Sequence, residues 1–299
     1  MSLWIEGVEI VDTFAEAFPM TASRAIVTAD TPGWAATAAR VMTGYGTSVI
    51  GCDAEAGIEG TLDEGETPDG RPGVSVLVFA FSRDALEKAL TNRVGQCVMT
   101  CPTSACYNGL PLADKSIKVG GSLRYFGDGW QISKRLPGGR RFWRVPVMDG
   151  EFTCEDRFGT LKGVAGGNLI IAGLDGPTTL AAAEAAVEAI GRLGGGVILP
   201  FPGGIARSGS KVGSKYKGLM ASSNAAFSPT LRGLVESELP ANAGAAYEVV
   251  IDGVDLESVG RATAAGVRAA CRPGIVRVTS GNYGGKLGPH HIRLHDVLA

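Results

Sequence analysis

The sequence is poor in the residues from which metal centres and nucleophile triads are usually built. It has only three histidines, all within the last ten residues. Strand alternation places His291, Arg293 and His295 on one face of a terminal strand, which favours a structural role. No HExxH metal motif, GxSxG nucleophile elbow or GxxxxGK[ST] phosphate loop occurs. A zinc hydrolase, a Ser-His-Asp enzyme and a nucleotide-binding enzyme are therefore all poorly supported.

Cysteine pairs are missing as well. The chain has six cysteines, and none of them forms a CxxC pair. The spacing Cys97-x3-Cys101-x4-Cys106 fits no familiar zinc or iron–sulfur pattern. A set of reduced thiols is the simplest interpretation, and it is typical of a cytoplasmic protein. We expect no bound metal.

Net charge is also small, since 28 basic residues stand against 30 acidic ones and leave a charge of −2. Such a chain has no overall positive field to attract nucleic acid or anionic lipid, so a basic site must be local. No apolar run approaches the roughly 20 residues of a membrane span, and the first residues lack a secretory pattern. We expect a cytoplasmic protein with no nucleic acid or membrane partner.

What the chain has in excess is glycine, with 44 residues in 299, about twice the usual share of roughly 7%. Between the glycine-rich turns, four segments carry helix signals, in the form of a capping residue or an apolar face with helical spacing. In the second of them, Leu86, Leu90 and Val94 lie on one face. The predicted helices are Trp34–Met42, Ser82–Val94, Thr178–Leu193 and Asp255–Ala270.

Segments rich in β-branched residues and bounded by glycine predict strands. These are Ala25–Thr28, Thr47–Ile50, Val74–Phe81, Gln96–Thr100, Asn168–Ala172, Val197–Leu199, Ala246–Ile251 and Ile275–Ser280. Two further segments, around Lys118–Phe126 and Arg141–Val147, are joined by the loop Leu136–Gly139 and predict a hairpin.

The order of these elements repeats itself along the chain. Each half runs through strand, helix, strand, a long loop, and then strand, helix, strand. This βαββαβ order is the ferredoxin-like split βαβ unit. We therefore predict an α+β fold of two ferredoxin-like lobes related by internal duplication. The boundary is expected near Asp149-Gly150, giving lobe 1–149, with an appended hairpin, and lobe 150–299. A single doubly wound sheet is the alternative architecture.

The segment Gly203–Gly218 has the most unusual local composition. Its glycines and serines, among them Ser210, expose backbone N–H groups, and its positive charges include Arg207, Lys211 and Lys215. Together they are suited to hold a carboxylate or a phosphate. A solvated surface loop is the other interpretation.

A second glycine-rich turn, Gly281–Gly288, follows a predicted strand. It resembles a Walker A loop but is one residue short, and Leu287 stands where Ser or Thr would bind magnesium. Either Asn282, Tyr283 and Lys286 face a cleft and bind substrate, or the turn is purely structural.

Glu248 is the most informative single residue. It is a lone carboxyl in the apolar strand segment Ala245–Ile251. If it is buried, its pKa is raised and it stays protonated near neutral pH. If that face of the sheet is open to water, Glu248 is an ordinary surface residue.

Several longer motifs, in collinear order from near the first residue to near the last, carry a resemblance to a known family. They are Asp12–Pro19, Glu66–Gly73, Asn108–Pro111, Pro200–Ile205 and Ser280–Gly288. In these motifs the chain resembles formylmethanofuran:tetrahydromethanopterin formyltransferases. Its near-neutral charge and six cysteines make it more similar to the bacterial version, the D subunit of the formyltransferase/hydrolase complex of methylotrophs.

The resemblance implies a function and a site. The family transfers a formyl group between methanofuran, or a bacterial analogue, and N5 of tetrahydromethanopterin, with these two carriers as substrates and no tightly bound cofactor. It implies a homotetramer that associates with the other subunits of that complex during the oxidation of formaldehyde to formate. The family's catalytic glutamate lies in a motif that here is Tyr247–Ile251, which indicates Glu248. A noncatalytic subunit that binds a carrier without acting on it is the alternative.

Overall fold

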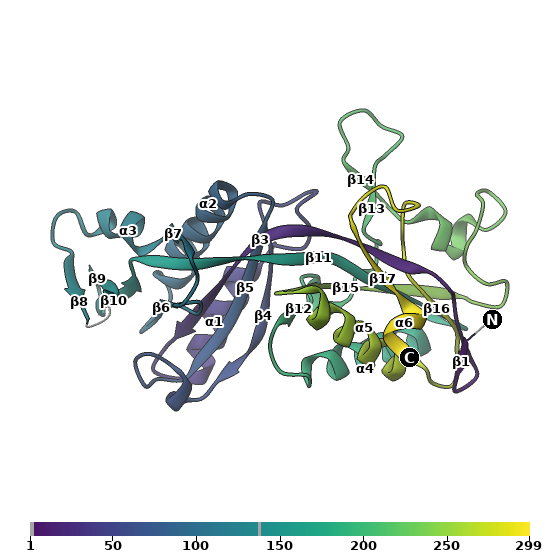
Figure 1. Ribbon diagram of the computed structural model, residues 1–299, viewed down its shortest axis with the longest axis horizontal. Coiled ribbons are helices and arrows are strands. Elements are labelled where there is room, and N and C mark those ends of the chain that lie inside the picture. The colour runs from purple at the N-terminus through teal and green to yellow at the C-terminus, as the bar shows by residue number, and fades with distance from the viewer. Residues whose placement is uncertain (1–2, 137–138) are drawn as a thin grey trace. The chain divides into compact units, whose positions relative to one another are not determined.

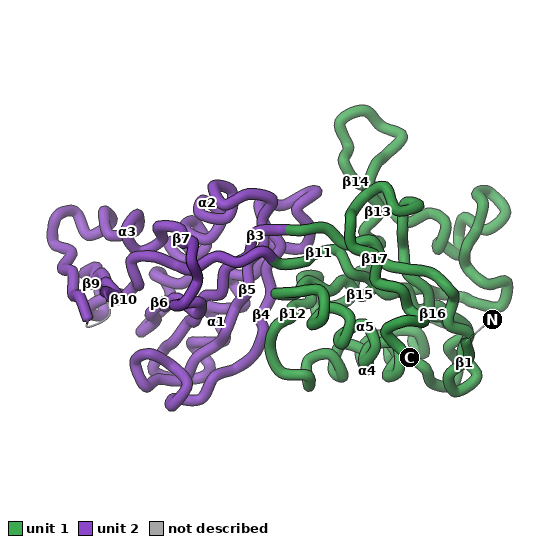
Figure 2. Tube along the Cα trace, viewed as in Figure 1, with its two compact units in different colours: residues 1–19, 163–299 green, residues 20–162 purple. Residues whose placement is uncertain are grey.

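The computed structural model describes residues 3–136 and 139–299, and these form two compact units (Figure 2). Unit 1 contains Met1–Pro19 and Gly163–Ala299, and unit 2 contains Met20–Lys162. The chain passes from unit 1 to unit 2 and back again, so no single boundary in the sequence separates the units. The two crossings lie within the long strands β3 (Phe14–Thr28) and β11 (Arg157–Gly173), which have residues in both units.

Unit 2 contains a ferredoxin-like βαββαβ lobe. After β3 come α1 (Pro32–Thr43), β4 (Glu55–Leu62), β5 (Gly73–Ala80), α2 (Arg83–Arg93) and β6 (Ala105–Asn108). The strands lie in the order β6-β3-β5-β4, and each pair is antiparallel. This 4-1-3-2 order is the split βαβ arrangement.

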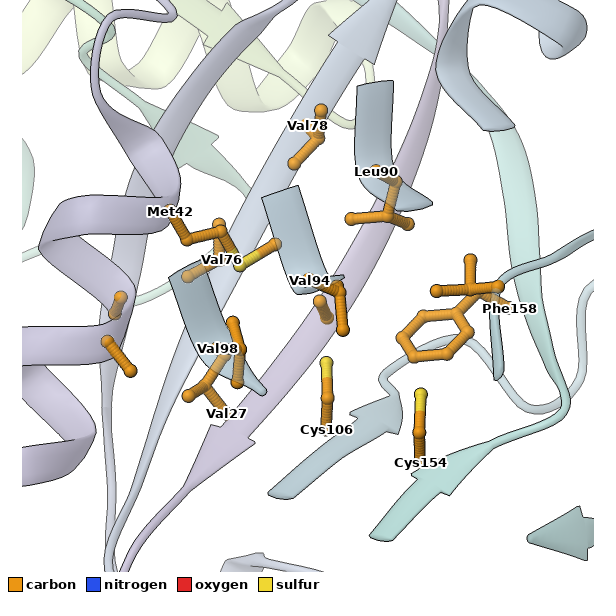
Figure 3. Packing of buried hydrophobic residues seen from close by; sticks show 14 of the residues in the cluster. Val27, Met42, Val76, Val78, Leu90, Val94, Val98, Cys106, Cys154 and Phe158 are labelled. Atoms are coloured by element: carbon orange, nitrogen blue, oxygen red, sulfur yellow. The ribbon is translucent and has the colours of Figure 1, made fainter. Parts of the chain in front are cut away.

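The core of unit 2 forms where the helices pack on this sheet. β-Branched residues of the strands, such as Val27 and Val76, meet Met42 of α1 and Leu90 of α2 (Figure 3). All four side chains are fully buried. Ser82 begins α2 by accepting a hydrogen bond from the Ala85 backbone N–H, as the capping signal predicts.

Unit 1 repeats the same topology with β11, α4 (Gly176–Gly191), β12 (Val197–Ile198), β15 (Ala245–Gly253), α5 (Leu256–Ala270) and β16 (Ile275–Thr279). Its strand order is β16-β11-β15-β12, again antiparallel throughout. Helices α4 and α5 lie side by side below β15 in Figure 1, and Val259 and Val267 of α5 face the core. The two ferredoxin-like lobes and the internal duplication are confirmed.

The two repeats exchange their first strands. Strand β2 (Val8–Ile10), near the start of the chain, pairs parallel with β16 at the end of the second repeat. Strand β10 (Gly150–Glu155), which opens the second repeat, pairs parallel with β6 of the first. Ile10 and Cys154 lie fully buried in the cores that these exchanged strands join. Because of this exchange, each compact unit contains the exchanged strand from the other repeat, so the units and the repeats have different bounds. The boundary near Asp149-Gly150 concerns the repeats, and it remains a prediction.

Shorter elements extend both units. Strand β1 (Leu3–Ile5) pairs with β2, and β17 (His290–Arg293) pairs with the first residues of β3. In unit 2, β7 (Lys115–Lys118) pairs with β11. The remaining elements are α3 (Gly120–Leu123), β8 (Ile132–Arg135), β9 (Arg141–Val147), β13 (Lys211–Val212), β14 (Ala221–Ser222) and α6 (Leu294–Leu298), with short 3-10 turns between them. No helix among the described residues is long and apolar enough to span a membrane.

Two predicted strands are wrong. Thr47–Ile50 forms a turn, where the Val49 N–H donates to Oε1 of Glu55, and the strand begins later, at β4. Gln96–Thr100 overlaps a single π-helical turn, Val94–Val98, that continues α2. The apolar residues Val94 and Val98 of this turn are four apart and both buried, so they mark a helical face and not a strand.

The predicted hairpin is shifted along the chain. Its strands are β8 and β9, whereas Lys118–Phe126 is mostly helical turns. Gly120 allows this because a Cβ atom there would clash with the Glu155 carbonyl of a neighbouring strand. The predicted loop Leu136–Gly139 includes residues 137 and 138, which lie outside the described residues. The terminal strand is shorter than predicted, because His295 belongs to α6, where its Nε2 contacts the Ile10 carbonyl oxygen.

Candidate active site

Glu248 lies in the middle of β15, on the face of the sheet opposite α4 and α5. Its neighbours in the strand, Tyr247 and Val249, pack with the helix-side core, and the cross-strand partner of Glu248 is Ile170. The Glu248 side chain is only 4% exposed. The sequence left open whether this face is wet, and the structure shows that the carboxyl is buried.

Three hydrogen bonds hold the Glu248 carboxyl. The Asn168 Nδ2 donates to Oε1 at 2.7 Å, and the Ser210 backbone N–H donates to Oε2 at 2.7 Å. The Ser210 hydroxyl lies 2.6 Å from Oε1. Residues far apart in the sequence thus meet at one carboxyl, and one of them comes from the basic, glycine-rich segment.

Burial raises the pKa of Glu248, and the hydrogen bonds from Ser210 and Asn168 oppose the rise without cancelling it. Desolvation favours the neutral form of a carboxyl, whereas donors favour the charged form. The Glu248 carboxyl therefore holds its proton to a higher pH than an ordinary glutamate does. Groups with shifted pKa values of this kind are typical of acid–base sites.

A cavity of about 380 Å³ opens beside Glu248. Its lining mixes apolar side chains with several uncharged polar ones, the cation Arg207 and Glu248 itself. The residues are Ile170, Ala206, Arg207, Ser208, Gly209, Ser223, Asn224, Phe227, Ser228, Pro229, Ala245, Ala246, Tyr247 and Glu248. A buried acid at the wall of a cavity with a few polar groups among apolar ones is the usual arrangement of an active site.

The basic segment forms an exposed hairpin next to this cavity. Strand β13 pairs with β14, and the loop between them projects away from the sheet in Figure 1. Lys211 and Lys215 are exposed on it, and no acidic residue occurs between Gly203 and Val235. The structure thus brings Arg207 to the cavity, Ser210 to Glu248, and the two lysines to the surface beyond it.

The second glycine-rich turn proves to be tied down by its own backbone and side chains. Asn282 Nδ2 donates to the Thr13 hydroxyl at 3.0 Å and to the Phe14 carbonyl, so Asn282 holds the turn together. The Tyr283 hydroxyl accepts from the Val212 N–H at 2.6 Å and so reaches the basic hairpin. Lys286 is exposed. Of the three predicted residues, only Tyr283 contacts the hairpin beside the cavity.

Glu16 anchors this turn, and the sequence analysis did not single it out. Its buried carboxylate accepts backbone N–H bonds from Tyr283, Gly285 and Leu287. Burial alone would raise the pKa of Glu16, but the three N–H donors and nearby His291 lower it by more, so the pKa lies below its usual value. The pKa of Glu16 is thus shifted in the opposite direction to the pKa of Glu248. The only sequence signal for Glu16 was its place in the Asp12–Pro19 motif.

Asn168 also escaped the sequence analysis, which treated it as the start of a strand. Its Oδ1 accepts from the Gly281 N–H, and its backbone carbonyl accepts from the Ser280 hydroxyl. Asn168 thereby connects Glu248 to the turn that Glu16 anchors. Within the described residues, no group of His, Cys, Asp and Glu side chains is arranged to hold a metal ion.

The fold and this site define a two-lobed α+β protein with a buried carboxyl at the wall of a cavity. The formylmethanofuran-tetrahydromethanopterin formyltransferase profile matches residues 3–147, and the profile of the proximal lobe of that family matches residues 150–297. The chain belongs to the formylmethanofuran-tetrahydromethanopterin formyltransferase family.

Relatives match over nearly the whole length. The chain is 54% identical over 299 residues to the formylmethanofuran–tetrahydromethanopterin formyltransferase of Methylococcus capsulatus, covering 99% of each chain. It resembles a chain in the crystal structure of the formyltransferase/hydrolase complex from Methylorubrum extorquens with methylofuran, with a TM-score of 0.95, 51% identity and coverage of 100% and 99%. It also resembles the Methanosarcina barkeri formyltransferase structure, with a TM-score of 0.92, 49% identity and coverage of 99% and 100%.

The role of Glu16 leads to a prediction about stability. Glu16→Gln leaves one amide oxygen for three N–H donors, so the free energy of unfolding at pH 7 should fall by about 1–3 kcal/mol. Because the folded-state pKa of Glu16 is lowered, its stabilisation is present above the unfolded value of about 4.3 and is lost as the pH falls further. Urea unfolding at pH 7 and below pH 4 measures this difference, which should shrink in acid.

Asp12→Asn is the matched control for this prediction, because the Asp12 side chain is 66% exposed. It should change stability by less than about 0.5 kcal/mol at either pH. A Glu16→Gln protein as stable as wild type at pH 7 would contradict the anchoring role.

Proposed function

We propose that this protein is an enzyme that transfers a formyl group between methanofuran, or a bacterial analogue such as methylofuran, and N5 of tetrahydromethanopterin. Both carriers act as substrates, and no tightly bound cofactor is needed. The observation that carries the proposal is the buried Glu248 carboxyl at the wall of a cavity of about 380 Å³. Family membership and relatives at 49–54% identity that are named for this activity support it.

Formyl transfer between two amines makes limited chemical demands. The acceptor N5 is a neutral amine, so no strong base is required for its attack on the formyl carbon. The attack forms an N–C bond and a tetrahedral intermediate that carries an oxyanion. Its breakdown releases a basic amine, which must leave with a proton. One acid at the wall of the cavity is suited to steady the oxyanion and to supply that proton.

Glu248 has the properties of such an acid. Burial raises the pKa of this carboxyl, and its three donor partners stabilise the carboxylate that remains once the proton has left. The proton that N5 loses after attack restores the acid, so the reaction consumes no net proton. A noncatalytic subunit has no need of a carboxyl with this environment. Turnover by the purified protein separates the two functions.

Arg207, Lys211 and Lys215 form the carrier-binding part of this proposal. Methanofurans carry glutamyl carboxylates, and the exposed basic hairpin beside the cavity provides the complementary charge. The Ser210 N–H and Tyr283 hydroxyl position this hairpin against the site. Asn282 and Lys286 belong to the turn that supports it.

The protein is further proposed to work in the cytoplasm as a homotetramer that docks onto the other subunits of a formyltransferase/hydrolase complex. A related subunit occurs in that complex in Methylorubrum extorquens. The six cysteines are free thiols, in keeping with a reducing compartment.

Removing the acid tests the central part of the proposal. Glu248→Gln keeps the shape of the side chain but cannot release a proton, so kcat should fall by about 10²-fold or more. KM should change far less than kcat, which is the pattern of a transition-state interaction. Glu248→Asp keeps an acid and should retain more activity than Glu248→Gln. Thermal unfolding of each variant checks that the fold is intact, and a folded Glu248→Gln enzyme with near-wild-type kcat would exclude the acid role.

The pH dependence of kcat gives an independent prediction. A general acid acts only when protonated, so kcat should fall as Glu248 ionises, at a pH above the usual value of about 4.3. Two nearby titratable groups have pKa values that are shifted away from this range. The pKa of Glu16 is lowered, and burial raises the pKa of Tyr283 above 10. A kcat that rises through this range would contradict the assignment.

The basic hairpin is tested by charge removal. Lys211→Ala with Lys215→Ala should raise KM for the furan carrier by roughly two- to thirtyfold at low salt, since exposed pairs contribute about 0.2–1 kcal/mol each. The effect should shrink at high salt because of screening. Lys134→Ala with Lys162→Ala, two exposed lysines of unit 2, is the matched control. An unchanged KM at low salt would remove the hairpin from the site.

The proposed assembly is tested by light scattering on the purified chain. At micromolar concentration, the mass should be about four times that of the 30.8 kDa chain at both low and moderate salt. A monomer under both conditions would contradict the homotetramer.

A further inference from the structure

The hydrogen-bond partners of Glu248 differ in whether they can act both as donor and as acceptor. The Ser210 backbone N–H is only a donor. The Asn168 amide is oriented by the Gly281 N–H, which requires Oδ1 as its acceptor, so Nδ2 must face Glu248 as a donor. The Ser210 hydroxyl alone among these three groups can either donate to Glu248 or accept from it.

This difference limits where the acidic proton is placed. Oε1 of Glu248 has two partners, the Asn168 Nδ2 and the Ser210 hydroxyl, which lies 2.6 Å away. When the proton is on Oε1, it points to the Ser210 oxygen, while the other lone pair still accepts from Asn168. The hydrogen of Ser210 is then released from Glu248 and is free to turn toward another acceptor.

We infer that the Ser210 hydroxyl relays the proton between Glu248 and the formyl group during transfer. The Glu248 Oε1–H bond breaks as its proton passes to the Ser210 oxygen. In the same step, the original Ser210 O–H bond breaks and delivers its proton to the oxyanion or to the departing amine. Ser210 stays neutral, and Glu248 becomes a carboxylate. The reverse sequence returns the proton that N5 loses.

The geometry suits the acid end of this relay. After transfer, the Ser210 hydroxyl donates to Oε1, and the new carboxylate keeps all three donors. A separation of 2.6 Å is typical of O–H···O bonds to a carboxylate, in which the proton moves a short distance. Ser210 directly follows Gly209, which lines the cavity together with Glu248, and it precedes strand β13 of the basic hairpin.

The relay rests on the proposed function, because it assumes that Glu248 supplies the proton. The experiment therefore compares Ser210→Ala, which removes the hydroxyl but keeps the backbone N–H, with Ser210→Thr, which keeps both. Ser122→Ala is the matched control, since the Ser122 hydroxyl donates to the Lys118 carbonyl oxygen in unit 2. Glu248→Gln is measured alongside. The readout is the single-turnover rate of formyl transfer from the formylated furan carrier to tetrahydromethanopterin.

Ser210→Ala should lower this rate by about 10²-fold, with Ser210→Thr within about tenfold of wild type and Ser122→Ala unchanged. In mixtures of H₂O and D₂O, a plot of the wild-type rate against the deuterium fraction should be curved and not linear, because two protons move in the same step. The dependence should become linear in Ser210→Ala. The wild-type measurement needs no variant, so it tests the relay even if a variant fails to fold.

Each other outcome has a defined meaning. If Ser210→Ala stays within threefold of wild type while Glu248→Gln is slow, Glu248 delivers its proton directly and the relay is wrong. Equal losses in Ser210→Ala and Ser210→Thr also overturn it, since the hydroxyl is then not the cause. A linear wild-type dependence on deuterium has the same consequence. If Glu248→Gln itself is near wild type, the acid role in the proposed function fails.

Discussion

The site depends on one constraint, which is that the carboxyl of Glu248 is buried in a sheet face yet keeps polar partners. A buried carboxyl without them is costly, and one with too many charged partners loses its proton. Asn168 and Ser210 meet this constraint with neutral donors. The orientation of the Asn168 amide depends in turn on the Gly281 N–H, and the adjoining turn is held by Glu16. Two carboxyls thus lie in opposite environments, which lower the pKa of Glu16 and raise the pKa of Glu248.

Much of the fold could be predicted from the sequence, because local signals agreed with the final structure. The helices begin at capping residues and bury the faces that their spacing defines, as Leu86 and Leu90 show. The failures have a common cause. Gln96–Thr100 is rich in strand-forming residues, but packing against α1 and β6 holds it as a helical turn. The exchange of β2 and β10 depends on pairings between residues about 50 to 270 positions apart, which no local pattern records.

The same division applies to the site. Glu248 could be found from the sequence because a lone acid in an apolar strand breaks the local pattern. Whether that acid was buried could not be decided, since burial depends on Ser210, which approaches from a loop 38 residues away. Glu16 and Asn168 sit in ordinary strand contexts, and their roles appear only when the turn at residues 280–288 closes over them. Residues that act by supporting another residue leave little trace in local sequence.

The duplication shows why the acid occurs in one lobe only. Counting from the repeated Asp-x-Phe motifs places Arg24 where the second repeat has Asn168, and the strand registers place Ser75 where it has Glu248. In unit 2, Arg24 forms a bidentate pair with Glu59, and the Ser75 hydroxyl donates to the same carboxylate. The Glu59 carboxylate is thus paired with a cation, whereas the partners of Glu248 are neutral donors. The two repeats share one architecture, and the side chains at these two positions give their carboxyls different environments.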